Sequence, residues 1–443
     1  MSIIGDKRIC SYLIYDALTQ KKGNHMLYTI PDYYASFQCI ADKCEDTCCA
    51  GWQIVIDKKT LKKYAKIKGD FRKQIFKNVN WLQGTFKQDK DKRCAFLNEK
   101  NLCDLYLSQG EEGFCKTCRE YPRHTEEFEG VREITLSISC PEVARILMNR
   151  KEPVTFLNYE KEGEEEFEDF DPFLYSILED ARKEMIVILQ NRALAITDRI
   201  LLILGMAHDM QGRMNRQEMF ACSDVIAKYT TDKALHFVKL YQQKMKDEEK
   251  EITFAHTMFK QLYHLELLRE EWGILLRETE DLLYQDKEKY KELSAEFIEF
   301  CKGYKEKSNR ELIDNNNIEK INLGKTMDGI EGNGQKIRYE NIAMDIHLEQ
   351  LLVYFLFTYF PGAVYDGEIY AKVQLAVYCV WMIWEIWMAR WVKNEKNLDL
   401  EEMTELVYRF SREVEHSDLN LREIERILSK KWFLTHKKRL VTE

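Results

Sequence analysis

The sequence predicts a mainly α-helical protein. An irregular, cysteine-rich N-terminal domain that binds a metal or cluster is followed by a multi-helix bundle. Nine of the thirteen cysteines fall between Cys39 and Cys140. Beyond residue 171, apolar residues recur at three- and four-residue spacing, which is the period of an amphipathic helix. With 443 residues, the chain is long enough for two or three domains whose cores need no crosslinks.

We predict four segments: an N-terminal segment (1–30), a cysteine-rich domain (31–150), an acidic linker (151–171) and a helical domain (172–443). Within the cysteine-rich domain, residues 52–57 and 133–139 alternate like short strands. Asp57 stands where it can cap a helix that begins near Lys58. The linker contains the run GEEEFEDFD, which has no clear period and is expected to be exposed.

The helical domain has few glycines and no proline between Pro172 and Pro361. Helical period predicts helices over 172–210, 217–246, 252–304, 340–360, 367–392, 401–412 and 420–430. The stretch 307–335 is rich in Asn and Gly and is predicted to be a surface loop. The helix at 367–392 is nearly long enough to span a bilayer, but Glu385 lies inside it and would be costly in lipid. A buried core helix is therefore predicted, and no membrane insertion is expected.

The formal net charge is −9, and acidic and basic residues are interspersed along most of the chain. A nucleic-acid-binding protein normally shows a basic patch, and the lysine-rich stretch 58–92 is the only candidate. Lysines interleaved with apolar residues are typical of the solvated face of an amphipathic helix, so no nucleic-acid partner is expected. The sequence also lacks a Walker motif and a G-x-G-x-x-G motif after a strand.

The clustered cysteines are the main indication of function. The N-terminus has no apolar stretch typical of a secretory signal, so we expect a cytoplasmic protein with reduced thiols. Thiolates select zinc, copper(I) or iron-sulfur clusters. Metal or cluster ligation is thus favoured over disulfides for Cys39, Cys44, Cys48, Cys49, Cys94, Cys103, Cys115, Cys118 and Cys140. The isolated Cys10, Cys222, Cys301 and Cys379 are predicted to be buried structural thiols.

Nine cysteines are more than one four-ligand metal site needs. They would suffice for two such sites with one cysteine left over, or for one cluster together with a reactive thiol. The adjacent Cys48 and Cys49 cannot easily serve one tetrahedral ion, which favours different centres for the two. Cys44 and Cys48 have the first spacing of C-x3-C-x2-C, the radical S-adenosylmethionine cluster motif, but Gly51 occupies the third position.

Arg119 and Arg123 flank the Cys115-x2-Cys118 pair. One hypothesis is that they offset thiolate charge and bind the carboxylate of a cofactor. The alternative is that they pair with local acids such as Glu120. Thiol redox exchange is disfavoured because no strand–CxxC–helix context surrounds the pair. The sequence identifies no catalytic residue.

Together these motifs resemble the flagellin lysine-N-methylase family, which has a zinc- or iron-chelating cysteine region at its N-terminus. The similar residues are Phe37-x-Cys39 with Cys44, Cys48, Cys49, Gly51 and Trp52; Cys94-x-Phe96-Leu97 and Cys103-x-Leu105; Cys115-x2-Cys118-Arg119-x-Tyr121-Pro122-Arg123; Leu136-Ser137-x-Ser139-Cys140-Pro141-Glu142-x-Ala144-Arg145; and, more weakly, Tyr339-Glu340-Asn341.

The resemblance implies a protein lysine N-methyltransferase that transfers methyl groups from S-adenosylmethionine to flagellin. It also implies an iron-sulfur cluster held by the cysteines, with 4Fe-4S as the expected form and zinc as the alternative. Methyl transfer needs a neutral, desolvated lysine, a carboxylate or tyrosine to accept its proton, and a negatively polarised pocket for the cationic donor. The competing hypothesis is a zinc- or iron-binding protein whose helical domain binds a partner without methyl transfer.

Overall fold

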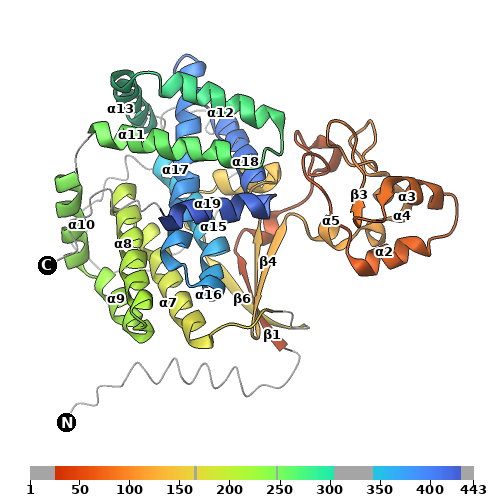
Figure 1. The fold of residues 1–443 in the computed structure, drawn as a ribbon, viewed down its shortest axis with the longest axis horizontal. Coiled ribbons are helices and arrows are strands. Elements are labelled where there is room, and N and C mark those ends of the chain that lie inside the picture. Colours follow the sequence, from red (N-terminus) through yellow and green to blue (C-terminus); the bar gives the residue numbers. More distant parts are fainter. Residues whose placement is uncertain (1–24, 164–166, 246–247, 304–342, 431–443) are drawn as a thin grey trace, which may run out of the picture.

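The computed structural model describes residues 25–163, 167–245, 248–303 and 343–430. A large helical body surrounds one face of a small sheet, and a cysteine-rich module projects from its side (Figure 1). The predicted loop at 307–335, the motif at 339–341, the N-terminal segment up to residue 24 and Cys10 lie outside these residues. The mainly helical architecture with an irregular N-terminal cysteine region is confirmed.

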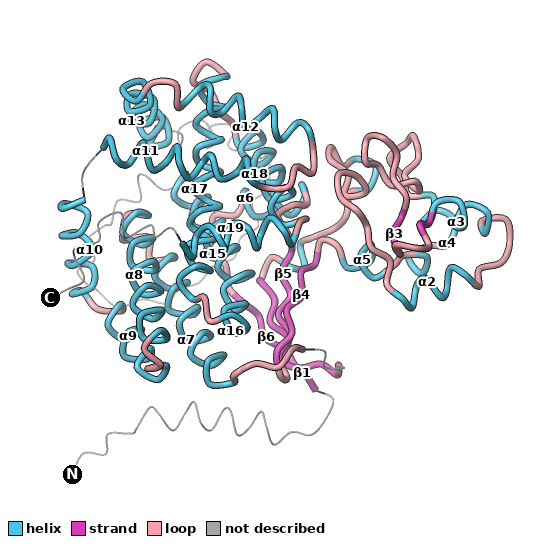
Figure 2. Tube along the Cα trace, viewed as in Figure 1, coloured by secondary structure: helices cyan, strands magenta, loops and turns pink. Residues whose placement is uncertain are grey.

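The module consists largely of loops, as Figure 2 shows. Its regular elements are α2 (Lys58–Ala65), α3 (Arg72–Asn78), α4 (Asp104–Gln109), α5 (Lys116–Glu120), β2 (Val79–Asn80), β3 (Thr85–Phe86) and the 3-10 helices η2 (Ala41–Lys43) and η3 (Glu111–Gly113). Asp57 caps α2 as predicted, because its carboxylate accepts from the Thr60 N–H at 2.9 Å. The strand predicted at 52–57 is reduced to one bridge, between Val55 and Thr85. The module has its own hydrophobic core, separate from that of the body.

The sheet has the order β4-β5-β1-β6. Its strands are β1 (His25–Pro31), β4 (Arg123–Phe128), β5 (Val131–Leu136) and β6 (Phe156–Glu162). β1 runs parallel to β5, and the two other pairs are antiparallel. β5 confirms the first part of the strand expected at 133–139, but it begins at Val131 and ends at Leu136. β6, however, lies inside the predicted linker at 151–171: it is an exposed edge strand that pairs through its backbone with β1, so it needs no alternating apolar residues.

The boundary predicted at residue 150 also differs from the structure. The sheet and the following helix α6 (Pro141–Met148) pack into the core of the helical body, through buried residues such as Leu136, Val143 and Leu147. Arg182 on the body forms an ion pair with Glu133 on β5, which ties the sheet to the helices. The sequence did not show that this segment belongs to the helical body, because it directly follows the cysteines of the module. Apolar residues in a sequence also do not indicate which of two cores they will enter.

The body is built from α7 (Pro172–Leu189), α8 (Ile196–Asn215), α9 (Cys222–Tyr229), α10 (Asp232–Met245), α11 (Glu248–Phe259), α12 (Glu270–Leu283), α13 (Lys287–Gly303), α15 (Ala343–Tyr359), α16 (Ala363–Asp366), α17 (Ile369–Lys393), α18 (Leu400–Glu415) and α19 (Asp418–Lys430). Four more 3-10 helices are η1 (Tyr34–Ser36), η4 (Met219–Ala221), η5 (Lys260–His264) and η6 (Phe360–Gly362). These elements match the predicted helical segments, except that several of the segments are divided into two or three helices.

Helix α17 is the central element and contacts α8, α12, α15, α18 and α19. Among the described helices it alone is long and apolar enough to cross a membrane, and 83% of its apolar window is buried inside the fold, as expected of a core helix. The buried Glu385 carboxylate accepts hydrogen bonds from the Tyr284 and Tyr290 hydroxyls, at 2.9 Å each, and from the Trp381 indole at 3.0 Å. Hydrogen bonds from other side chains thus compensate for burying the Glu385 carboxyl group inside the protein.

Candidate functional site at the junction of module and body

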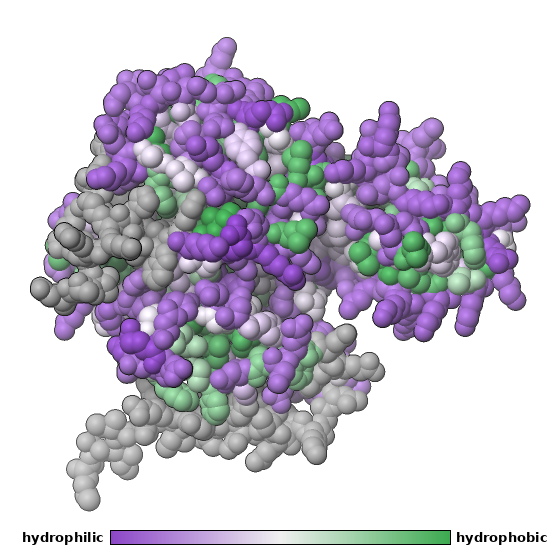
Figure 3. Space-filling view, in the orientation of Figure 1, coloured by the Kyte–Doolittle hydropathy of each residue, from purple (hydrophilic) through white to green (hydrophobic). Residues whose placement is uncertain are grey.

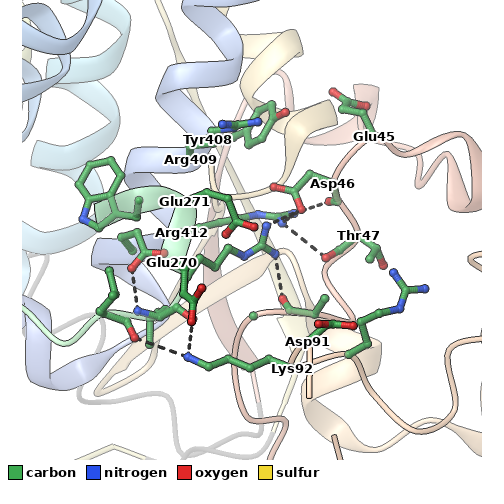
Figure 4. Close-up of a pocket in the computed structure, with 18 of the residues that line it drawn as sticks. Glu45, Asp46, Thr47, Asp91, Lys92, Glu270, Glu271, Tyr408, Arg409 and Arg412 are labelled. Carbon is green, nitrogen blue, oxygen red and sulfur yellow. Dashed lines mark hydrogen bonds and ion pairs between the residues drawn. The ribbon is translucent and has the colours of Figure 1, made fainter. Parts of the chain in front are cut away.

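A cleft of about 750 Å³ lies where the cysteine module meets the helical body. Its module side is formed by residues 44–47, 50–51, 90–93 and 101, and its body side by residues 267–272 and 275 and by α18 (Figure 4). The residues from α18 are Tyr408, Arg409, Arg412 and Glu413. The cleft thus depends on how the two parts are joined, and no single segment of sequence contains it.

Two arginines of the body hold the loop that carries Cys48 and Cys49. The buried guanidinium of Arg412 lies 2.5 Å from an Asp46 carboxylate oxygen and donates to the Ser139 carbonyl at 2.7 Å. Arg269, the residue before α12, donates to the same Asp46 oxygen at 2.7 Å and to the Ala50 carbonyl at 3.0 Å. Both arginines therefore form ion pairs with Asp46 of this loop (Figure 4).

Gly51 ends this loop and has a positive φ of +90°. A Cβ at this position would stand 2.4 Å from Arg269 Nε, closer than side-chain atoms can approach. Glycine is required both by the backbone conformation and by the guanidinium packed against it. The residue that departs from the C-x3-C-x2-C spacing therefore has a structural role of its own.

Glu413 is the buried acid of the cleft. Burial raises the pKa of its carboxyl group to about 7, although the Leu268 backbone N–H donates to it at 2.9 Å and Arg269 and Lys92 lie nearby. Lys92 reaches across from the module and donates to the Leu268 carbonyl at 2.5 Å. A carboxyl group with a pKa near neutrality can take up a proton at physiological pH. The sequence predicted the helix but missed Glu413, because no local pattern separates it from the other acids of α18.

A buried polar network lies behind the cleft. The Ser139 hydroxyl contacts the Ser137 hydroxyl at 2.6 Å, the His416 Nε2 at 2.9 Å and the Tyr121 hydroxyl at 3.1 Å. Burial, with Arg412 nearby, lowers the pKa of His416 to about 3, so this imidazole is neutral at physiological pH. The network connects the segment before Cys140 to the end of α18.

The nine predicted ligands are divided between two places. Cys49, Cys94, Cys103, Cys115 and Cys118 belong to the core of the module, and we call them the inner thiols. Cys44, Cys48 and Cys140 lie near one another and near Arg412, and we call them the junction thiols. Cys39 is exposed. The adjacent Cys48 and Cys49 thus belong to different groups, although their thiols are hydrogen-bonded.

The donor set agrees in chemistry with a soft metal or an iron-sulfur cluster. The twelve described cysteines are free thiols, and the hydrogen bond from Cys48 lowers the pKa of Cys49 to about 7. Cys103 and Cys115 occupy the N-cap positions of α4 and α5. Burial raises the pKa of Cys103 to about 11, whereas the hydrogen bond with Cys118 lowers the pKa of Cys115. Within the described ranges, however, no three Cys, His, Asp or Glu side chains stand at ligand spacing. Ligation would therefore require the thiols to move closer together.

Arg119 and Arg123 lie outside the cleft. Arg119 donates to the Phe114 carbonyl at 3.1 Å. Arg123 donates to the Tyr34 hydroxyl at 2.8 Å and stands over the rings of Tyr34 and Phe37. The arginines that line the cleft are instead Arg93, Arg269, Arg409 and Arg412, which are distant from the C-x2-C pair in sequence.

Comparisons with known proteins identify the family of the chain. Residues 182–440 match the FliB lysine N-methylase C-terminal domain. Over 129 residues the chain is 31% identical to a lysine-N-methylase of Salmonella typhimurium, an alignment that covers 27% of this chain and 32% of that protein. It is also 31% identical over 129 residues to the flagellar biosynthetic protein FliU of Salmonella muenchen, covering 76% of that protein. The chain therefore spans about a third of the length of the Salmonella lysine-N-methylase. No solved structure matches it.

Proposed function

Because the chain belongs to the FliB lysine N-methylase family, we propose that it is a protein lysine N-methyltransferase that uses S-adenosylmethionine and acts on flagellin. The names of the Salmonella relatives, lysine-N-methylase and flagellar biosynthetic protein, support the reaction and the substrate. The observation in the structure that supports this function best is the position of Glu413, a buried carboxyl group with a pKa near 7 in a cleft large enough for small molecules.

Four charged groups of the cleft have roles in this proposal. S-adenosylmethionine, when bound, supplies an electrophilic methyl group on a sulfonium. Glu413 takes the proton that the substrate lysine must lose before its amine can attack. The carboxylates of Glu270 and Glu271 line the same cleft and favour a cationic substrate side chain and a cationic donor. Arg409, also on the wall, pairs with Glu405 at 2.6 Å and offers the rest of its guanidinium to the carboxylate end of the donor.

The inner thiols are our proposed ligands for an iron-sulfur cluster of the 4Fe-4S type, with zinc as the alternative. Five thiols in or against one small core exceed the four that such a cluster needs. When bound, the cluster would hold the loops of the module together, because metal binding contributes directly to folding of small domains. The free thiols also support a cytoplasmic location, where cysteines stay reduced.

The decisive experiment for the reaction is incubation of the anaerobically purified protein with labelled S-adenosylmethionine and flagellin, followed by mass analysis of lysine peptides. The wild-type protein should methylate lysines, and Glu413→Gln should lower kcat by about 100-fold or more with donor binding retained. The matched control is Glu423→Gln, a change at a partly exposed glutamate on α19 that pairs with Arg426. Unmodified flagellin under conditions where the donor binds would count against the proposal.

The pH dependence gives a second test of Glu413. Its carboxylate is the active form, so kcat/KM should fall as pH decreases through about 7. The Gln variant should lose this limb of the profile, and Glu423→Gln should keep it. An unchanged profile in Glu413→Gln would assign the base to another group.

Metal analysis separates the two cofactor hypotheses. Broad visible absorbance with acid-labile sulfide supports the cluster, and colourless protein with stoichiometric zinc supports the alternative. Ser replacement of Cys115 and Cys118 should abolish metal content, whereas Ser replacement of the isolated Cys222 should not. Zinc content without any binding of S-adenosylmethionine would favour a metal-binding protein with a helical partner domain.

A further inference from the structure

The outer end of the cysteine module carries an exposed aromatic group that the proposed chemistry does not use. Phe76 on α3 and Trp81 in the turn after β2 have ring centroids 4.9 Å apart, and the Arg72 guanidinium stands 5.0 Å from the Phe76 centroid. Phe76 is 41% exposed, Trp81 37% and the adjacent Leu82 96%. We call Arg72, Phe76, Trp81 and Leu82 the aromatic platform.

The turn that presents the platform is well ordered by its own hydrogen bonds. The Gly84 N–H donates to the Asn80 carbonyl at 2.8 Å, and the Asn80 side-chain amide donates to Gln83 at 2.5 Å. Leu82 lies at the tip of this turn. Apolar side chains held in one exposed arrangement lose little conformational entropy when a partner binds them.

The module is also strongly basic in a chain that is acidic as a whole. Residues 51–93 contain 13 Lys and Arg against 4 Asp and no Glu, whereas the entire chain has a net charge of −9. Lys73 and Lys77 are exposed on α3, the helix that carries Phe76. Figure 3 shows hydrophobic side chains at the surface of the projecting module within a rim of hydrophilic ones. An apolar centre with a charged rim is the composition of a protein–protein interface.

We propose that the aromatic platform is a docking site for the protein substrate and that it binds an acidic surface with an apolar centre. This inference rests on the proposed methyltransferase function. Positive charge around the platform attracts an acidic partner and raises the association rate. The aromatic and arginine side chains are the types that dominate binding energy at such interfaces.

The platform favours a protein over a nucleic acid as its partner. Single-stranded nucleic acids bind mainly by stacking bases on aromatic faces. Here Phe76 is covered by Arg72 and contacts Trp81, so part of the aromatic surface is already in use. Leu82 cannot stack with a base, whereas an apolar pocket of a protein would bury this protruding side chain favourably.

The test compares Trp81→Ala/Leu82→Ser with a matched control, Phe220→Ala/Leu419→Ser, which removes two similarly exposed side chains from the helical body. Binding of purified flagellin to the 443-residue chain is measured by calorimetry, and methylation kinetics are measured in parallel. Circular dichroism and metal content establish that each variant folds. The platform variant should raise Kd and KM for flagellin by about tenfold or more and leave kcat unchanged. The control should behave as wild type.

A second variant, Lys73→Glu/Lys77→Glu, tests the charge. It should weaken flagellin binding most at low salt, because charge attraction is screened as salt increases. The proposal is overturned if wild type does not bind flagellin, if the platform variant binds it as well as wild type, or if that variant loses only the binding of a single-stranded RNA oligonucleotide. Platform-dependent binding of flagellin without any methylation would refute the proposed function and leave the docking site standing.

Discussion

Replacing Gly51 by Ala should weaken the hydrogen bonds between the helical body and the loop that carries Cys48 and Cys49. Two costs combine at this position. A non-glycine residue at a φ of +90° costs about 1–3 kcal/mol in backbone strain. The new Cβ also displaces Arg269, whose bonds to Asp46 and the Ala50 carbonyl at 2.7 and 3.0 Å are charge-assisted and worth about 1.5–3 kcal/mol. Because Arg269 is partly exposed, we expect the free energy of unfolding to fall by an amount near the sum of the two lower limits, about 3 kcal/mol.

The chain contains a matched control for the strain alone. Gly69 has nearly the same φ, +89°, but a Cβ there would meet no atom within 4 Å. Gly69→Ala should therefore cost only about 1 kcal/mol. Urea unfolding of the full chain, followed by circular dichroism, measures both losses.

A double-mutant cycle isolates the contribution of the guanidinium. In an Arg269→Met background, the flexible side chain can yield, so Gly51→Ala should cost about as much as Gly69→Ala. Equal losses for the two glycine variants in the wild-type background would refute the argument. So would strict additivity of Gly51→Ala and Arg269→Met.

Three further predictions concern the scaffold. Burial raises the pKa of Glu385 to about 7, so the protonated group stabilises the fold at low pH and this stabilisation is lost as pH rises through 7. Relative to Glu385→Gln, the free energy of unfolding of the wild type should fall by about 3 kcal/mol between pH 4 and pH 8, as measured by urea unfolding. Asp57→Ala should destabilise the module by about 1–2 kcal/mol, seen as faster hydrogen exchange in α2, because it removes the cap of that helix. Arg182→Met should lower the free energy of unfolding by about 3–5 kcal/mol, measured by thermal unfolding, because it leaves the Glu133 carboxylate buried without its partner. Adding Glu133→Gln to this variant should recover part of the lost stability.

The candidate site was only partly predictable from the sequence. Cysteine spacing singled out the region of the module, and Cys48 and Cys49 lie in different groups of thiols, but the prediction that they serve different metal centres stays a prediction. Arg119 and Arg123 were selected because they adjoin the C-x2-C pair, yet the cleft is lined by Arg269 and Arg412 instead. Proximity in sequence is a weak guide to a site that forms between two separately folded parts.

The sequence by itself determined the features that arise from neighbouring residues: the helical period of the body, the capped start of α2 and the concentration of thiols in the first third of the chain. Only the tertiary structure decided that β1 pairs with β5 about a hundred residues away, that α18 meets the cysteine loop, and that Glu413 is buried in the resulting cleft. Periodicity reports which face of a segment is apolar. The partner of that face, and the desolvation that raises the pKa of an acid, depend on the packing of all segments together.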